Sequence, residues 1–133
     1  LGVASATKMC RSVMIKGLEA MIIESFTTAR HYGVEDAVIA SLQETFPGID
    51  WEKQGAYFFQ RVIEHGRRRS EEVREVAVTV REAGLAPLMA DATAERQDWM
   101  GRQKAPLGLD QLGKDANWRA YADRLLADPT ASR

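Results

Sequence analysis

Apolar residues recur every three or four positions along almost the whole chain, which is the spacing of an α-helix. The longest such pattern predicts a first helix from about residue 3 to residue 31. Its apolar positions cover more than half of the helix circumference, and such a helix is normally surrounded by other elements. These positions are Val3, Ala6, Met9, Cys10, Val13, Met14, Leu18, Met21, Ile22 and Phe26. The remaining arc is one polar stripe of Ser5, Lys8, Ser12, Lys16 and Glu19.

Five further helices are predicted by the same periodicity, over residues 35–46, 51–65, 67–83, 87–103 and 116–127. Gly33 and Gly84 stand where the first and fourth helices end, and glycine readily takes the left-handed conformation that closes a helix. Asp50 can cap the third helix, and Pro87 suits the first turn of the fifth. We therefore expect an all-α, multi-helix domain built around one long central N-terminal helix.

The length of 133 residues is that of one domain. We expect its core in residues 1–104, with a loop, the last helix and a polar tail in residues 105–133. The last helix is expected to bury Trp118, Tyr121 and Leu125. Because the chain starts at Leu1 rather than at methionine, we expect it to be a piece of a longer protein.

The composition is that of a soluble globular protein, with 45% hydrophobic and 28% charged residues. A formal net charge of −1 argues against binding to nucleic acid and against a polybasic membrane anchor. The single cysteine, Cys10, excludes an internal disulfide and suits a reducing compartment. No apolar run approaches the length of a bilayer span. The expected location is the cytoplasm.

One stretch, "GLDQLGKD", has Gly108, Gly113 and Lys114 at the spacing of a phosphate-binding loop. That loop needs serine or threonine next, to hold magnesium, but Asp115 stands there and no strand precedes the first glycine. A carboxylate at this position would repel phosphate. We expect Asp115 to cap the last helix instead.

The two histidines, His31 and His65, each lie close to a glycine at a predicted helix end. Imidazole commonly meets free carbonyl groups there. Neither has a cysteine or carboxylate at metal-ligand spacing, so no metal site is predicted.

Three consecutive arginines, Arg67, Arg68 and Arg69, open the predicted fourth helix, where their charge opposes the helix macrodipole. Two of them are placed for i,i+4 pairs with Glu71 and Glu72, which favours a solvated face. The alternative is that an anion or a partner surface meets the arginines.

Lys8 is the main candidate for chemistry, and two interpretations stay open on physical grounds. It is either a solvated lysine of the first helical turns or a group beside a bound molecule. In the second case Gly2 and Ala4 let a ligand approach the backbone, and the free amides of the helix start attract carboxylate or phosphate. Partial burial next to Ser5 and Ser12 would then suit Lys8 to proton transfer.

Residues 2–34, "GVASATKMCRSVMIKGLEAMIIESFTTARHYGV", resemble the start of the C-terminal helical domain in the 6-phosphogluconate dehydrogenase and β-hydroxyacid dehydrogenase superfamily. Members carry a glycine-rich tract, a lysine and, four residues later, an asparagine. Gly2 and Lys8 match the tract and the lysine, and Ser12 stands at the asparagine position. "EEVREVAVTVREAGLAP" is similar to a later helix that opens with a lysine and an aspartate, here Glu71 and Glu72. The resemblance is closest to an uncharacterised branch.

This resemblance implies half of an enzyme. An N-terminal Rossmann domain, absent from this chain, would bind NAD or NADP, while the helical domain closes the cleft and builds a homodimer. Lys8 would act as general base on a small anionic hydroxy acid, with Gly2, Ser5, Ser12 and Glu72 binding the substrate. Because no G-x-G-x-x-G occurs, the isolated chain is predicted to be inactive. The alternative is a non-enzymatic helical oligomerisation module.

Overall fold

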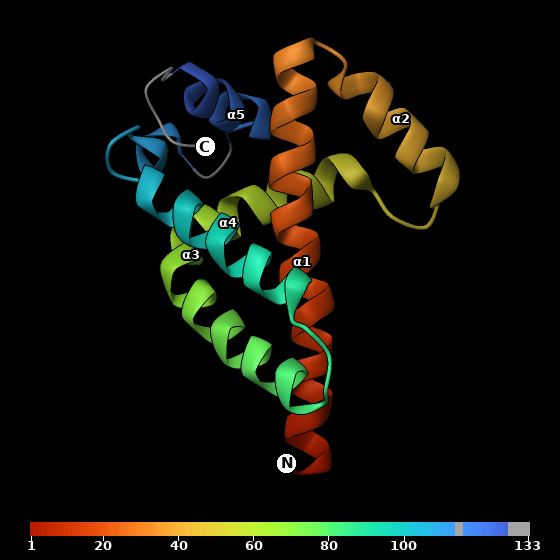
Figure 1. Ribbon diagram of the computed structural model, residues 1–133. Helices are drawn as coiled ribbons and strands as arrows, with labels where there is room; N and C mark the ends of the chain where they lie inside the picture. Colours follow the sequence, from red (N-terminus) through yellow and green to blue (C-terminus); the bar gives the residue numbers. More distant parts are fainter. Residues whose placement is uncertain (114–115, 128–133) are drawn as a thin grey trace.

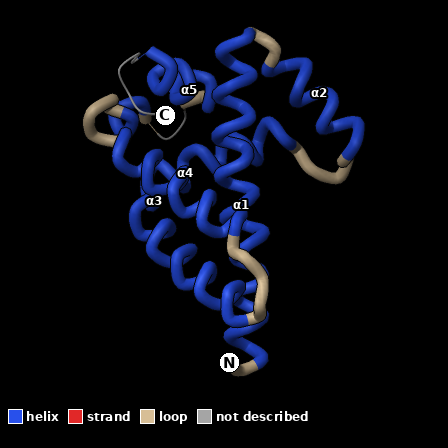
Figure 2. The backbone as a smooth tube through the Cα atoms, in the orientation of Figure 1, coloured by secondary structure: helices blue, strands red, loops and turns tan. Residues whose placement is uncertain are grey.

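The fold is all-α in the computed structural model, which describes residues 1–113 and 116–127 (Figures 1 and 2). Within these residues five α-helices, one short 3₁₀ helix and no strand are found. In chain order they are α1 (Val3–Tyr32), α2 (Glu35–Thr45), α3 (Trp51–Glu82), α4 (Leu88–Gln103), the 3₁₀ helix η1 (Leu109–Leu112) and α5 (Trp118–Ala127). The expected fold class is confirmed.

The helix ends follow from local chemistry. Gly33 has a φ of 69°, and its N–H donates to the carbonyl groups of Ala29 and Arg30, which closes α1. The side chain of Asp50 accepts a hydrogen bond of 3.1 Å from the N–H of Lys53 at the start of α3. Both predicted caps are confirmed.

The prediction of separate helices over 51–65 and 67–83 was wrong, because α3 is one helix through Gly66. It changes direction part-way along its length, first passing α1 and then running beside α4 (Figure 1). A Cβ at Gly66 would stand 2.6 Å from the carbonyl oxygen of Gln97, and one at Gly101 would stand 2.9 Å from the N of Arg67. The two glycines therefore allow α3 and α4 to pack closely, and Gly66 does not end a helix.

The main core lies between the second half of α1, the first half of α3, the end of α4 and α5. Its centre is aromatic: the ring of Trp118 lies 5.1 Å from that of Phe26 and 5.6 Å from that of Phe59. Trp118, Tyr121 and Leu125 are all buried, as expected for the last helix. This helix packs into the same core as the residues before 104.

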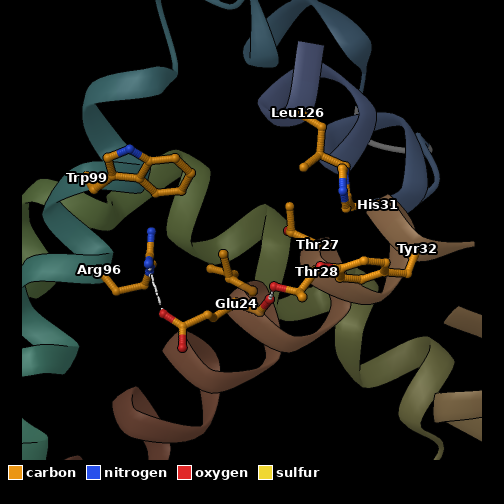
Figure 3. Close-up of a pocket in the computed structure, with 9 residues that line it drawn as sticks. Glu24, Thr27, Thr28, His31, Tyr32, Arg96, Trp99 and Leu126 are labelled. Carbon is orange, nitrogen blue, oxygen red and sulfur yellow. Dashed lines mark hydrogen bonds and ion pairs between the residues drawn. The ribbon is translucent and has the colours of Figure 1, made fainter. Parts of the chain in front are cut away.

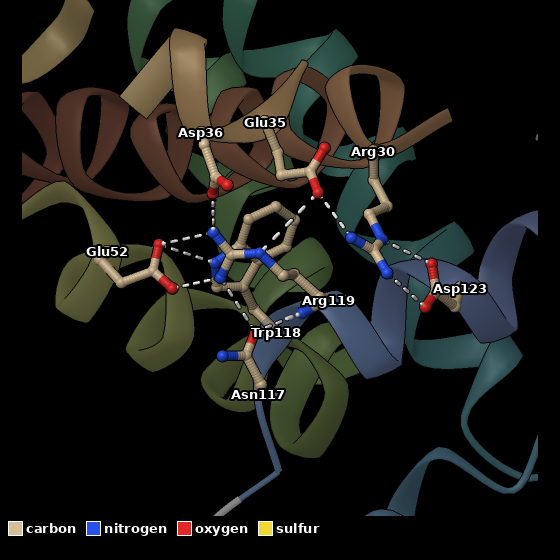
Figure 4. Close-up of polar contacts among 8 residues, drawn as sticks. All are labelled: Arg30, Glu35, Asp36, Glu52, Asn117, Trp118, Arg119 and Asp123. Carbon is tan, nitrogen blue, oxygen red and sulfur yellow. Dashed lines mark hydrogen bonds and ion pairs between the residues drawn. The ribbon is translucent and has the colours of Figure 1, made fainter. Parts of the chain in front are cut away.

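A polar network on the surface fastens α5 to α1, α2 and α3 (Figure 4). Arg119 donates to Asp36 at 2.7 Å and also to Glu52, and its guanidinium lies 4.7 Å from the centre of the Trp118 ring. Arg30 donates to Asp123 at 2.8 Å and to Glu35. A hydrogen bond from its own backbone lowers the pKa of Glu35, and the hydrogen bond from Arg30 lowers it further.

The first half of α1 departs from the expectation of a surrounded helix. All of the buried residues of α1 lie between Glu19 and Ala29. The N-terminal end of α1 extends past the other helices in Figure 1, and Val3 and Met14 are 85% and 72% exposed. Only the second half of α1 is central in this chain. None of the described helices combines the length and apolar character that a bilayer span requires.

Candidate functional site

Lys8 lies in the N-terminal half of α1, which has no buried residue, and its side chain is exposed. The partial burial that the interpretation of Lys8 as a proton-transfer group requires is not present in this chain. Gly2 and Ser5 are exposed as well, and a Cβ at Gly2 would meet nothing within 4 Å. Gly2 precedes α1 without a side-chain cap, and the first turn has no acidic residue. The start of α1 is therefore open to an approaching molecule, with Lys8 two turns into the helix.

The face that carries Lys8 continues into the interior of the domain. Ser12 lies one turn further along and is half-buried, and Glu19 lies two turns beyond Ser12 and is 1% exposed. Lys16 stands between them, half-buried. One stripe of α1 thus runs from an open surface at Lys8 to a buried polar cluster at Glu19.

A buried ion pair joins this stripe to α3. Arg69 donates from Nε to Oε1 of Glu19 at 3.1 Å and from Nη2 to Oε2. Gln97 of α4 donates from Nε2 to Oε1 of Glu19 at 3.1 Å and to the carbonyl oxygen of Lys16 at 3.0 Å. Gln97 is fully buried. The cluster therefore fixes α1, α3 and α4 relative to one another at the level of Lys16.

Lys16 and Glu72 form the open edge of this cluster. Nζ of Lys16 lies 3.8 Å from Oε2 of Glu72, and the Lys16 side chain is 15% exposed. Burial lowers the pKa of Lys16, and the charge of Arg69 lowers it further. The negative charge of Glu72 opposes this shift by raising the pKa. Glu72 also lies 3.9 Å from Nε of Arg68. Lys16 is thus a partly desolvated cation loosely paired with a half-exposed carboxylate.

The three arginines do not share one surface. Arg69 is bound to Glu19 inside the domain, so the anion-binding role predicted for it is replaced by an internal one. Arg67 and Arg68 are exposed. The expected i,i+4 pair of Arg68 with Glu72 is present, and among the described residues no ion pair joins Arg67 to Glu71. In the stretch that begins with Glu71 and Glu72, Glu72 forms an ion pair with Lys16 of α1, and Glu71 is exposed.

The opposite face of α1 is exposed, and its apolar side chains are interrupted by Thr7, Ser25 and Thr28. Val3, Cys10, Met14, Met21 and Tyr32 lie at spacings of whole helical turns and form a stripe along the outside of the helix. Where α1 meets α2, the stripe runs into a groove of about 500 Å³. The groove is lined by Met21, Glu24, Ser25, Thr28, Ala29, Tyr32, Val34 and Val38.

A cavity of about 280 Å³ lies at the C-terminal half of α1, between that helix, α4 and α5 (Figure 3). Arg96 donates to Glu24 at 2.8 Å and lies 4.8 Å from the centre of the Trp99 ring at its wall. Glu24 is sixteen residues beyond Lys8, or about 24 Å along the helix axis. The cavity is therefore separate from the surface around Lys8, and no motif in the sequence marked it.

The histidines and the glycine-rich stretch carry no site in the described residues. His31 lies in the last turn of α1, as expected, and its ring meets Tyr32 edge-on at 4.8 Å. His65 lies inside α3 beside Glu64, so its expected place at a helix end was wrong. Gly108 and Gly113 flank η1. Lys114 and Asp115, including the predicted cap, lie outside the described residues.

Comparisons with known proteins identify the family. Residues 29–100 match the model of a domain of unknown function, DUF1932, and this match covers more than half of the chain. The chain belongs to this family.

Two relatives are informative about length. An uncharacterized 28.5 kDa protein in the 7S RNA 5′ region of Methanothermus fervidus is 33% identical over 100 residues, which are 70% of this chain and 37% of that protein. The crystal structure of a conserved hypothetical protein from Sinorhizobium meliloti 1021 is similar, with a TM-score of 0.86 and 38% identity over 95% of this chain and 41% of that one. The chain thus spans about two-fifths of the length of each.

Proposed function

We propose that this chain is the C-terminal helical domain of an NAD(P)-dependent oxidoreductase of the 6-phosphogluconate dehydrogenase and β-hydroxyacid dehydrogenase superfamily. Its substrate is a small anionic hydroxy acid. The observation that supports the proposal is the exposed position of Lys8 in the N-terminal half of α1, in line with Ser12 and the polar cluster. The relatives leave room for a further domain, because the chain spans 37% and 41% of them.

Lys8 is the general base in this proposal. It takes the proton of the substrate hydroxyl group while the hydrogen on the same carbon leaves as hydride, so that the alcohol becomes a carbonyl. NAD or NADP supplies the acceptor for that hydride. A lysine acts as a base only when uncharged, so the exposed Lys8 must be covered by another domain or by a partner chain in the working enzyme.

The dinucleotide would be held mainly outside this chain. The described residues contain helices and loops but no strand, whereas the glycine-rich dinucleotide fingerprint needs a strand before its loop. This chain would supply the open start of α1 at Gly2 and Ser5, the base Lys8 and the neighbouring Ser12. Alone, it would transfer no hydride.

The exposed apolar stripe of α1 supports the homodimer as a partner, because a second copy can cover such a stripe. The same stripe is the observation that favours the alternative function, a helical oligomerisation module without catalysis. The two functions differ in what Lys8 does. In the module Lys8 is a solvated surface residue, and its replacement has no effect.

Replacement of Lys8 in the whole protein that contains this chain tests the proposal. Lys8→Ala is expected to lower the rate of hydride transfer by a factor of about 10² or more, because the step loses its general base, while NAD(P)H binding stays unchanged. Lys53→Ala, another exposed lysine, is the matched control. Near-normal turnover of Lys8→Ala would contradict the assignment.

A further inference from the structure

We propose that Lys16 receives the anionic group of the substrate whose hydroxyl group faces Lys8. This inference rests on the proposed function and deepens it, since it assigns a substrate-binding role to a residue that matches no position of the motif around Lys8. Three observations support it: the direction of the Lys16 side chain, the hydrogen bond that holds the Lys16 backbone, and the charges around Lys16.

The helix geometry directs Lys16 toward Lys8. The two residues are eight positions apart, slightly more than two turns, and Ser12 lies between them on the same stripe. Side chains of an α-helix lean toward its N-terminus, so the Lys16 side chain leans back along the stripe. The rise between the two residues is about 12 Å. Two long lysine side chains can therefore reach opposite ends of one small acid, with the Ser12 hydroxyl group between them.

The backbone that carries Lys16 is held in place. Its carbonyl oxygen accepts the 3.0 Å hydrogen bond from Gln97, and the Glu19–Arg69 pair lies one turn further into the domain. Lys8, in contrast, lies in the half of α1 that has no buried residue, and it is exposed. Lys16 therefore has a held backbone, whereas Lys8 must be covered by another domain. A cation held in this way is suited to binding and orienting a substrate before the chemical step.

The charge balance around Lys16 favours an anion. Arg11 and Arg69 both act on Lys16 as cations, and Arg68 is a further cation close to Glu72. The carboxylates are Glu19, which is already bound to Arg69, and Glu72. Glu72 lies 3.8 Å from Lys16 and 3.9 Å from Arg68, which is too long for a hydrogen bond to either. A substrate carboxylate or phosphate can supply the direct contact that Lys16 lacks.

Malonate is the probe for this site, because it is a small dianion that needs no turnover. Titration of the 133-residue chain, labelled with ¹³C-lysine and followed by NMR, is expected to shift the Lys16 side-chain resonances saturably and those of Lys53 little. Lys16→Met is expected to weaken malonate binding about tenfold or more, since a hydrogen bond between charged groups is lost. Lys16→Arg keeps the charge and should restore most of the binding, whereas Lys53→Met should change nothing.

The outcomes separate this inference from the proposed function. The role of Lys16 is overturned if millimolar malonate does not shift the Lys16 resonances. It is also overturned if Lys16→Met binds malonate as tightly as the parent chain. Either result holds even if Lys8→Ala abolishes turnover. Malonate binding that depends on Lys16, in a whole protein that transfers no hydride, supports an anion site and removes the dehydrogenase assignment. In an active whole protein, Lys16→Met should raise KM for a carboxylate substrate about tenfold and leave kcat within about twofold.

Discussion

The buried ion pair between α1 and α3 makes a strong prediction for Arg69→Met. Glu19 is 1% and Arg69 is 7% exposed, so water reaches neither group well enough to replace the other. The substitution removes both hydrogen bonds from Arg69 to the carboxylate. Within residues 1–113 and 116–127, Glu19 then keeps the 3.1 Å hydrogen bond from Gln97. The carboxylate is left in the interior without its ion-pair partner, with Lys16 as a remaining nearby cation.

The expected cost follows from that geometry. Removing one partner of a buried ion pair lowers the free energy of unfolding by about 3–5 kcal/mol. Because Gln97 still donates to Glu19, we expect the lower part of this range, about 3 kcal/mol. Domains of ordinary stability unfold with about 5–15 kcal/mol, so the change is large. It corresponds to a decrease in Tm of roughly 10 °C for a chain of this length.

Urea unfolding of the chain, followed by circular dichroism at neutral pH, measures this change. Arg68→Met is the matched control, because the Arg68 side chain is 65% exposed and should contribute less than about 0.5 kcal/mol. The double variant Glu19→Leu/Arg69→Met should recover most of the loss, since no unpaired charge remains. If Arg69→Met is no less stable than Arg68→Met, the ion pair does not stabilise the junction of α1 with α3.

Two further substitutions test the packing and the apolar stripe. Gly66→Ala should lower the free energy of unfolding by about 1–3 kcal/mol in the same urea assay, because the added Cβ would stand 2.6 Å from the Gln97 carbonyl oxygen. Gly48→Ala is the control, because a Cβ there has no atom within 4 Å. Equal stability of the two variants would contradict the close approach of α3 and α4. Met14→Asp should shift the whole protein from dimer to monomer in sedimentation velocity, because it places a charge in the apolar stripe, while Lys53→Asp should leave the dimer intact. A dimer unaffected by Met14→Asp would show that the stripe lies outside the interface.

Local signals in the sequence were sufficient to predict most of the helices. The caps at Gly33 and Asp50 depend on neighbouring residues only, and both are present in the structure. The prediction that α3 is two helices was wrong because a glycine in a sequence can either end a helix or allow another helix to pack closely against it. Its actual partner is Gly101, thirty-five positions away on α4, and one chain without an alignment gives no sign of that contact.

The candidate site divides in a similar way. Lys8, Ser12, Lys16 and Glu19 form one polar stripe by helical periodicity alone, and the structure retains it. The partner of Glu19 is fifty positions away, and the arginine run offered three equivalent candidates for any anion. Folding distinguishes them, because the turn of α3 that buries Ser70 and Val73 also buries Arg69.

The most direct test of the proposed function is transfer of deuterium by the whole protein that contains this chain. NADH and NADPH labelled at C4 of the nicotinamide are supplied with a panel of small oxo acids, and the hydroxy acids formed are analysed by mass spectrometry. The proposed function predicts one deuterium on the hydroxyl-bearing carbon of at least one product, and its loss in Lys8→Ala. A folded, dimeric protein that transfers no deuterium to any member of the panel would contradict the dehydrogenase and favour the oligomerisation module.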